Sequence, residues 1–171
     1  MTRPVVFLDI DGVLNHKVLY RAMEARRGNN TPVDWLDPVC VRRLDALCDA
    51  TGAVLVMSSS WRTYGPEKGH PGEPYEWAAE ILASAGLRTK IIDGTPDKAE
   101  KHGSLWLGQT RWTEIRAWLE EHPEVTRWVI LDDCDLEGIP GEWFVRFVRT
   151  DIAVGLTDMD VAQAVAALEA P

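Results

Sequence analysis

The sequence predicts an α/β fold with a mostly parallel central sheet and helices on both of its faces. Short apolar runs typical of buried strands alternate with segments of helical periodicity along the chain. Because helices fill most of the connections, neighbouring strands are expected to run parallel. Polar clusters also follow three of the runs, at the sheet edge where such folds bind ligands.

Five strands are predicted from the apolar runs, and no internal repeat or low-complexity linker divides the chain. The strands are expected at residues 4–8, 53–57, 89–92, 128–131 and 143–148.

The first helix is predicted between the first and second strands, and the second helix between the second and third strands. Asp37 is a favourable N-cap with Pro38 in the first turn, and this helix is expected to end at Gly52. The second is expected to follow Pro74 and to stop at Gly86.

Two more helices are predicted in the second half of the chain. One places Ile115 and Trp118 at helical spacing and is ended by Pro123, and the other begins at Thr157 and carries Val161. Between the predicted elements, residues 15–36 have room for a short flap, and residues 62–73 are predicted to form a loop.

Composition predicts a single domain over residues 1–171. The chain is 46% apolar, which is ample for a core, and its formal charge of −9 argues against a non-specific nucleic-acid binder. No run approaches the roughly 18 apolar residues of a membrane span, and the first apolar run is interrupted too early for a secretion signal. Three irregularly spaced cysteines fit neither a disulfide framework nor a zinc site. A cytoplasmic protein with no membrane partner is therefore expected.

The first apolar run ends in two carboxylates, Asp9 and Asp11, followed by Gly12. Residues two apart in a strand face the same way, so both acids can converge on one point at the strand tip. Two like charges held this close need a cation or a proton between them. The alternative is that both acids simply begin a turn.

Two other predicted strands also end in polar residues. Ser58 follows the second strand, and Asp132 and Asp133 follow the fourth. Together with Asp9 and Asp11 these acids would form an oxygen-rich site suited to Mg²⁺ and to substrate phosphate oxygens. The Ser58 hydroxyl could bond a phosphoryl oxygen, and a positive side chain would offset charge on a transferring phosphoryl group.

These motifs resemble those of the haloacid dehalogenase superfamily of phosphotransferases, in order along the chain. The first motif corresponds to Asp9-Ile10-Asp11-Gly12, the second to Ser58, and the fourth to Asp132-Asp133. The stretches D-x-D-G-V-L-N, S-S-W-R, E-I-x-x-W-L and V-I-L-D-D further resemble the small group of such domains associated with RNA-repair proteins. The resemblance implies a Rossmann-like three-layer sandwich. Members of this superfamily often carry a cap domain inserted after the first or second motif, but residues 15–36 and 62–73 leave room for little or no cap here.

The resemblance also implies roles for these residues. Asp9 would be the nucleophile that forms an aspartyl-phosphate, and Asp11 would protonate the leaving oxygen and then activate water. Mg²⁺ would be held by Asp9, the backbone carbonyl of Asp11, and Asp132, with Asp133 as a ligand or a support.

The third motif of the superfamily is a single Lys or Arg ahead of the helix that leads to the last acidic strand. Arg111 is our choice for this position, and Lys98 and Lys101 are its competitors.

For several neighbouring residues the sequence leaves two roles open. Ser59 is either a substrate contact or a helix cap, and Arg62 either clamps a substrate anion or pairs with an acid. Asn15 either fixes the loop after the first motif or touches substrate. Trp35 and Trp61 are expected near strand-tip loops, where they pack or offer a surface on which a base can stack.

The sequence thus predicts a Mg²⁺-dependent phosphomonoesterase. With little room for a cap, its site would be open to a phosphorylated nucleic-acid end or a nucleotide, although the acidic net charge opposes tight nucleic-acid binding. The alternatives are a non-catalytic phospho-acceptor or binding module, a small-molecule phosphatase, and a metal-dependent nuclease built on the same acids.

Overall fold

The computed structural model describes residues 3–26, 28, 30–67, 69, 71–97, 107–135 and 138–170. A five-stranded sheet forms its centre in the order β3-β2-β1-β4-β5, and every neighbouring pair is parallel. The strands are β1 (Val5–Leu8), β2 (Val54–Met57), β3 (Ile91–Gly94), β4 (Trp128–Asp132) and β5 (Phe147–Arg149). The predicted α/β fold with a parallel sheet is confirmed.

β1 lies at the middle of the sheet and is paired on both sides in level register. Leu8 lies opposite Met57 of β2 on one side and Leu131 of β4 on the other. The chain adds β2 and β3 on one side of β1 and β4 and β5 on the other, so strand order reverses at β1. Ligands of open α/β sheets bind beyond the strand ends at this kind of reversal.

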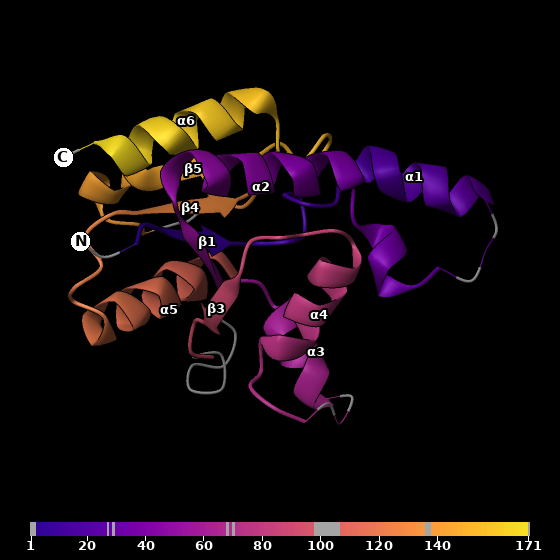
Figure 1. Cartoon of the computed structure of the whole chain (residues 1–171), viewed down its shortest axis with the longest axis horizontal. Coiled ribbons are helices and arrows are strands. Elements are labelled where there is room, and N and C mark those ends of the chain that lie inside the picture. The colour runs from indigo at the N-terminus through magenta and orange to yellow at the C-terminus, as the bar shows by residue number, and fades with distance from the viewer. Residues whose placement is uncertain are drawn as a thin grey trace.

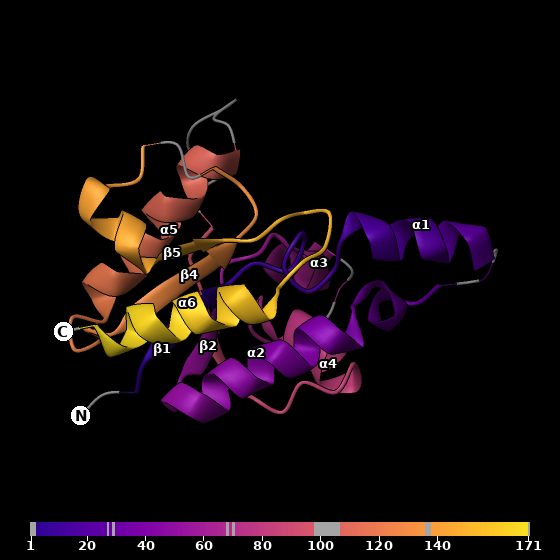
Figure 2. The same cartoon turned by 90° about the horizontal axis from the view of Figure 1, so that it is seen from above.

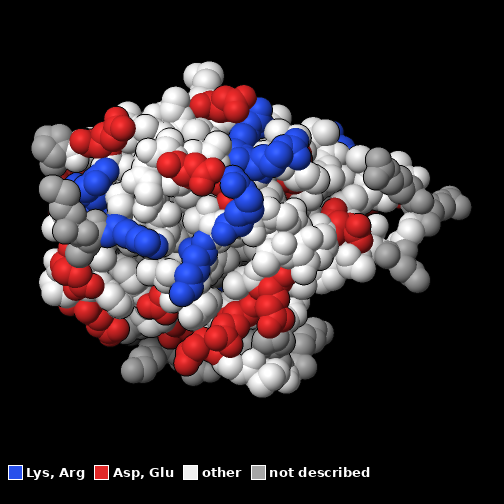
Figure 3. All heavy atoms as spheres, viewed as in Figure 1, with Lys and Arg blue, Asp and Glu red and all other residues white. Residues whose placement is uncertain are grey.

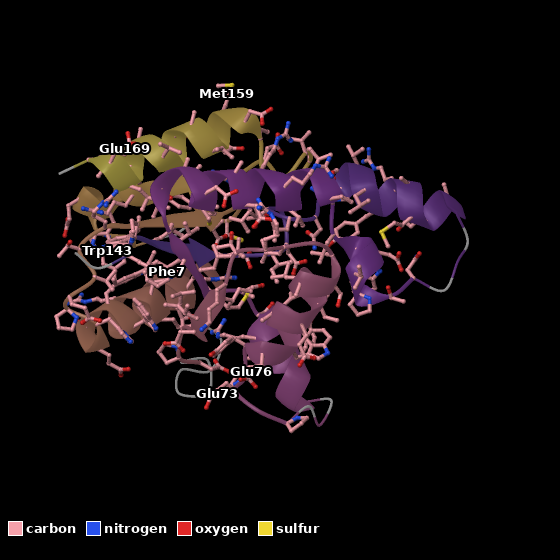
Figure 4. The ribbon with its side chains drawn as sticks, in the orientation of Figure 1. Phe7, Glu73, Glu76, Trp143, Met159 and Glu169 are labelled. Carbon is pink, nitrogen blue, oxygen red and sulfur yellow. The ribbon has the colours of Figure 1, made fainter. Side chains whose placement is uncertain are left out.

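Helices cover both faces of the sheet (Figure 1). α2 (Pro38–Thr51) and α6 (Asp158–Glu169) pack side by side on one face, and α5 (Leu107–Glu121) lies on the other, as the view from above also shows (Figure 2). Phe7 on β1 points toward the α5 side, where its ring meets Trp118 edge-on at 5.4 Å between centroids (Figure 4). Period-2 alternation along β1 therefore divides its side chains between two buried cores.

The helix boundaries follow the predicted capping signals. Asp37 accepts a hydrogen bond from the Val39 N–H at 2.7 Å, and Gly52 ends α2 in the left-handed conformation. Thr157 forms a capping box with Asp160 at the start of α6. α4 (Glu76–Ser84) likewise falls within the predicted second helix.

The structure differs from the sequence-based prediction in three segments. Residues 15–36, predicted as a flap, contain α1 (Lys17–Arg26) and the 3₁₀ helix η1 (Pro32–Trp35), and α1 extends beyond the end of the sheet (Figure 2). Residues 62–67 of the predicted loop lie in α3 (Trp61–Glu67), which forms because burial of Trp61 outweighs the breaking effect of Gly65 and Pro66. Residues 141–146 form the 3₁₀ helix η3 (Gly141–Arg146), which shortens the fifth strand.

The outer surface is mixed in charge on the face shown in Figure 3. Basic side chains form a narrow diagonal band there, and acidic side chains border it on both sides. Within the part of the chain that the structure describes, none of the helices has the length and apolar content needed to cross a membrane.

One buried carboxylate on α2 binds the segment that leads into β3, and we expect its removal to lower the free energy of unfolding. Asp45 accepts hydrogen bonds from the Thr89 N–H at 2.9 Å, the Thr89 hydroxyl at 2.7 Å and the Arg88 N–H at 3.1 Å. Asp45→Ala leaves these donors without their acceptor, so the free energy of unfolding in denaturant titrations should fall by about 3 kcal/mol.

Asp49→Ala is the matched control, since it makes the same substitution one turn later on α2. Asp49 also pairs with Arg88, at 2.8 Å, but its side chain is 63% exposed. Exposed pairs contribute about 1 kcal/mol or less, so the control should lose far less stability. Equal losses in the two variants would contradict the role given to Asp45.

Candidate active site

The tip of β1 carries the first two acids to different environments. Asp9 is buried, and its N–H continues the sheet by donating to the Leu131 carbonyl at 3.0 Å. Asp11 lies in the turn that follows and is exposed. The two acids are thus close in sequence but unequal in burial.

The neighbouring strand tips bring Ser58 and Asp132 to the same edge. The Ser58 N–H donates to the Leu8 carbonyl at 2.9 Å, which places Ser58 directly beside the end of β1. Asp132 is fully buried at the end of β4, and one of its carboxylate oxygens accepts from the Cys134 N–H at 2.9 Å. Asp133, the next residue, is half-buried. The level register of the three strands is the cause of this convergence.

Arg111 from α5 supplies positive charge to this edge. Its Nη1 lies 3.0 Å from Asp9 Oδ1 and 3.5 Å from Asp132 Oδ2. The same nitrogen donates to the Ser58 carbonyl oxygen. One guanidinium therefore contacts all three central strand tips.

Burial and mutual repulsion destabilise the charged forms of the acids in this cluster. Burial, followed by the charge of Asp9, raises the pKa of Asp132 above its ordinary value, and the same two causes raise the pKa of Asp133. Burial works to lower the pKa of Arg111, but Asp9 and Asp132 more than offset it, so this pKa is raised and the group stays cationic. The cluster thus favours further positive charge beside it.

Two buried polar atoms at this edge have no hydrogen-bond partner among the described residues. They are Ser58 Oγ and Asp132 Oδ2. Buried hydroxyl and carboxylate oxygens are normally paired, so both atoms are suited to meet a ligand.

A set of three donors holds the exposed Asp11 carboxylate. Asn15 Nδ2 donates to Asp11 Oδ1 at 2.7 Å, and Trp61 Nε1 donates to Oδ2 at 3.1 Å. The Tyr20 hydroxyl donates to Oδ1 at 3.3 Å. Burial, with the Asp11 charge as the next cause, holds the pKa of Tyr20 above its ordinary value, so the phenol keeps the proton it donates. Asp11 is therefore fixed in orientation.

Three residues for which the sequence left two roles open make hydrogen bonds within the protein. Asn15 is fully buried and its Oδ1 accepts from the Gly12 N–H at 2.9 Å, so it fixes the loop after β1. Ser59 Oγ accepts from the Trp61 N–H at 3.4 Å, at the start of α3. The Arg62 guanidinium donates to Glu114 at 2.7 Å and to the Ser59 carbonyl at 2.7 Å, which is pairing with an acid.

Gly12 is required by the close approach of the β1 and β4 tips. Its φ is +75°, and a Cβ built on it would overlap the side chain of Asp133. The Thr150 hydroxyl, just beyond β5, donates to the Gly12 carbonyl at 2.8 Å. The turn after β1 is thus fixed from two directions.

The sequence did not single out Tyr20, Glu114 or Thr150. Thr150 follows the fifth strand, so the strand-tip rule that found Ser58 could have found it had that strand been placed correctly. Glu114 lies one helical turn from Arg111, but nothing in the sequence pairs it with Arg62. Tyr20 lies on α1, a helix that the sequence did not predict.

Comparison with protein families gives one match. Residues 5–161 match the family described as "HAD domain in Swiss Army Knife RNA repair proteins". The chain belongs to this family. No match was found among curated proteins or among solved structures.

The family assignment confirms the resemblance seen in the sequence motifs. The matched range includes all five described strands and the residues predicted for the four motifs. HAD membership indicates phosphatase-like chemistry, and HAD domains generally use Mg²⁺. Of the candidates for the third motif, Arg111 contacts the acids, whereas Lys98 and Lys101 lie outside the described residues.

We expect Gly12→Ala to lower the free energy of unfolding by more than a left-handed backbone conformation alone would cost. A left-handed alanine costs about 1–2 kcal/mol, and overlap with Asp133 should add about 1–3 kcal/mol. Denaturant unfolding of Gly52→Ala provides the control, because Gly52 has φ +69° with open space around its Cβ position. Equal losses of unfolding free energy at the two positions would show that Asp133 yields without cost.

Proposed function

We propose that this HAD domain is a Mg²⁺-dependent phosphomonoesterase that works through an aspartyl-phosphate on Asp9. The observation that carries the proposal is the arrangement at the three central strand tips. A buried carboxylate, a cationic guanidinium and an unpartnered hydroxyl meet there, from Asp9, Arg111 and Ser58. These are a nucleophile, a charge stabiliser and a hydrogen-bond donor for phosphoryl transfer.

The donor set fits a magnesium ion. Asp132 Oδ2 is buried without a hydrogen-bond partner among the described residues. Burial and the charge of Asp9 raise the pKa values of Asp132 and Asp133, so a cation beside them would favour their charged forms. We assign Asp9, Asp132 and the backbone carbonyl of Asp11 as the groups that would hold Mg²⁺, with Asp133 beside them. When bound, the ion would neutralise phosphate oxygens during transfer.

In the first step, a carboxylate oxygen of Asp9 attacks phosphorus. The new O–P bond forms as the bond to the leaving oxygen breaks, and Asp11 gives its proton to that oxygen. Arg111 holds Asp9 in place and offsets charge on the phosphoryl oxygens, and Ser58 donates a hydrogen bond to one of them.

In the second step, Asp11 removes a proton from a water that attacks phosphorus. The bond between phosphorus and the Asp9 oxygen then breaks, which releases inorganic phosphate and restores the Asp9 carboxylate. The donors Asn15 and Trp61 keep Asp11 oriented for both proton transfers.

The two acids should differ in the size of their mutational effects. We expect Asp9→Asn to abolish phosphate release from a generic phosphomonoester, since the amide cannot act as the nucleophile. Asp11→Asn should lower kcat by about 10²- to 10⁴-fold, the usual contribution of a general acid and base. Phosphate release is measured with Mg²⁺ present.

Asp158→Asn, an exposed acid on α6, serves as the control for the loss of one charge. Unchanged turnover in Asp9→Asn would exclude the proposed nucleophile. A stable phosphoprotein without turnover would favour the phospho-acceptor alternative, and release of nucleotides in place of phosphate would favour a nuclease.

Magnesium should stabilise the folded protein by binding to it. At a Mg²⁺ concentration of about 100 times Kd, the gain in unfolding free energy is about 2.7 kcal/mol, visible as a higher midpoint of thermal unfolding. Asp132→Asn should remove most of this gain, whereas Asp158→Asn should keep it. An equal gain in the Asp132 variant would place the ion elsewhere.

A further inference from the structure

A large aromatic pocket opens beside Asp11. Its volume is about 740 Å³, within the range of small-molecule sites. Two segments inserted after the first and second strand tips build it: α1 with η1, and α3 with α4. Its lining includes Asp11, Tyr20, Trp35, Trp61, Tyr64 and Trp77.

Five of these side chains are aromatic, and two of them are unusually exposed. Trp35 is 42% exposed and Tyr64 is 44% exposed, although both line the same pocket. The Trp77 ring lies 6.0 Å from that of Trp61 and 6.2 Å from that of Tyr64, so these three form one continuous wall. Flat exposed rings of this kind are suited to stack on a planar group.

The pocket is suited to an uncharged group. Among the described side chains, its lining contains acids, Asp11 and Glu24, and includes neither Lys nor Arg. A phosphate is therefore expected at Arg111 and Ser58 and not in the pocket. Glu24 and Asn30 add a carboxylate acceptor and an amide that both donates and accepts, the groups that pair with the polar edges of a base.

The pocket is connected to the proposed chemistry through Asp11. Trp61 lines the pocket and donates to Asp11 at 3.1 Å, and Tyr20 lines it and donates at 3.3 Å. A substrate whose leaving oxygen is protonated by Asp11 therefore has its organic part directed at the aromatic wall.

We propose that the pocket binds the base of a nucleoside monophosphate unit whose phosphate lies at Asp9. This inference rests on the proposed phosphomonoesterase function and names its substrate class. A free nucleotide and the phosphorylated end of a nucleic acid both supply this unit, since they share its chemistry. The net charge of −9 opposes tight binding of the rest of a polyanion, so recognition is expected to centre on the terminal unit.

The test compares AMP with ribose 5-phosphate, which has the same phosphate and pentose without the base. Stacking contributes about 1–3 kcal/mol per base, so kcat/KM should be about 5- to 150-fold higher for AMP. The double variant Trp35→Ala/Tyr64→Ala should lower this ratio by about tenfold, mainly through KM for AMP. Trp35→Phe/Tyr64→Phe keeps two rings and should retain most of it.

Phe144→Ala is the matched control, because Phe144 is an exposed aromatic residue, 59% exposed, on η3 outside the pocket. It should leave the ratio unchanged. Circular dichroism and the thermal midpoint establish that each variant is folded. A ratio near one in the unaltered protein, or an equal fall in the Phe144 variant, would overturn the proposal. Preference for p-nitrophenyl phosphate over every nucleotide would also overturn it, in favour of a simple aryl ester.

Binding by calorimetry separates this inference from the proposed function. Asp9→Asn should bind AMP more tightly than ribose 5-phosphate even though it turns over neither. If no phosphoester is hydrolysed by the unaltered protein but AMP still binds at the aromatic wall, the phosphatase proposal fails and the pocket remains. If turnover is found without base preference in either assay, the pocket proposal fails alone. Oligonucleotides with 5′ or 3′ phosphate, compared with the free nucleotides, identify the source of the unit.

Discussion

The interaction on which the rest of the structure depends is the contact of Arg111 with the two buried acids Asp9 and Asp132. Parallel pairing forces these carboxylates onto adjacent strand tips, where burial makes their charges costly. Arg111 offsets part of that cost and also binds the Ser58 carbonyl, so a single side chain from α5 joins three strands. The remaining demand for positive charge is what makes the edge suitable for a metal ion.

The proposed chemistry and the proposed recognition belong to separate parts of the chain. The sheet carries the residues proposed to react, and the segments inserted after β1 and β2 carry the aromatic wall. A buried ion pair connects the two parts, because Arg62 on α3 binds Glu114 on α5 at 2.7 Å, one turn from Arg111. Loss of one partner would leave a buried charge uncompensated, so the pair fixes the pocket wall against the helix that carries the cation.

The parallel sheet and the convergence of acids and Ser58 at its edge could be predicted because both follow from local patterns. Apolar runs located the strands, and the residue after each run located Asp9, Ser58 and Asp132. α3 could not be predicted in this way, since Gly65 and Pro66 signal a loop and only tertiary burial of Trp61 overrides them. The sequence placed Trp35 and Trp61 near strand-tip loops, but it did not predict the pocket that they share. The pocket also takes rings from α1 and α4, and no periodicity connects these elements.

The level pairing of β1 with both neighbours also constrains how the chain can change during evolution. Leu8, Met57 and Leu131 lie opposite one another in the sheet. Each of them immediately precedes a residue of the candidate site. Inserting or deleting one residue within a strand would turn its side chains to the opposite face and carry the reactive group away from its partners. Length variation is therefore expected to collect in the segments that build the pocket, so that descendants of this domain can acquire new ligands while the reaction stays the same.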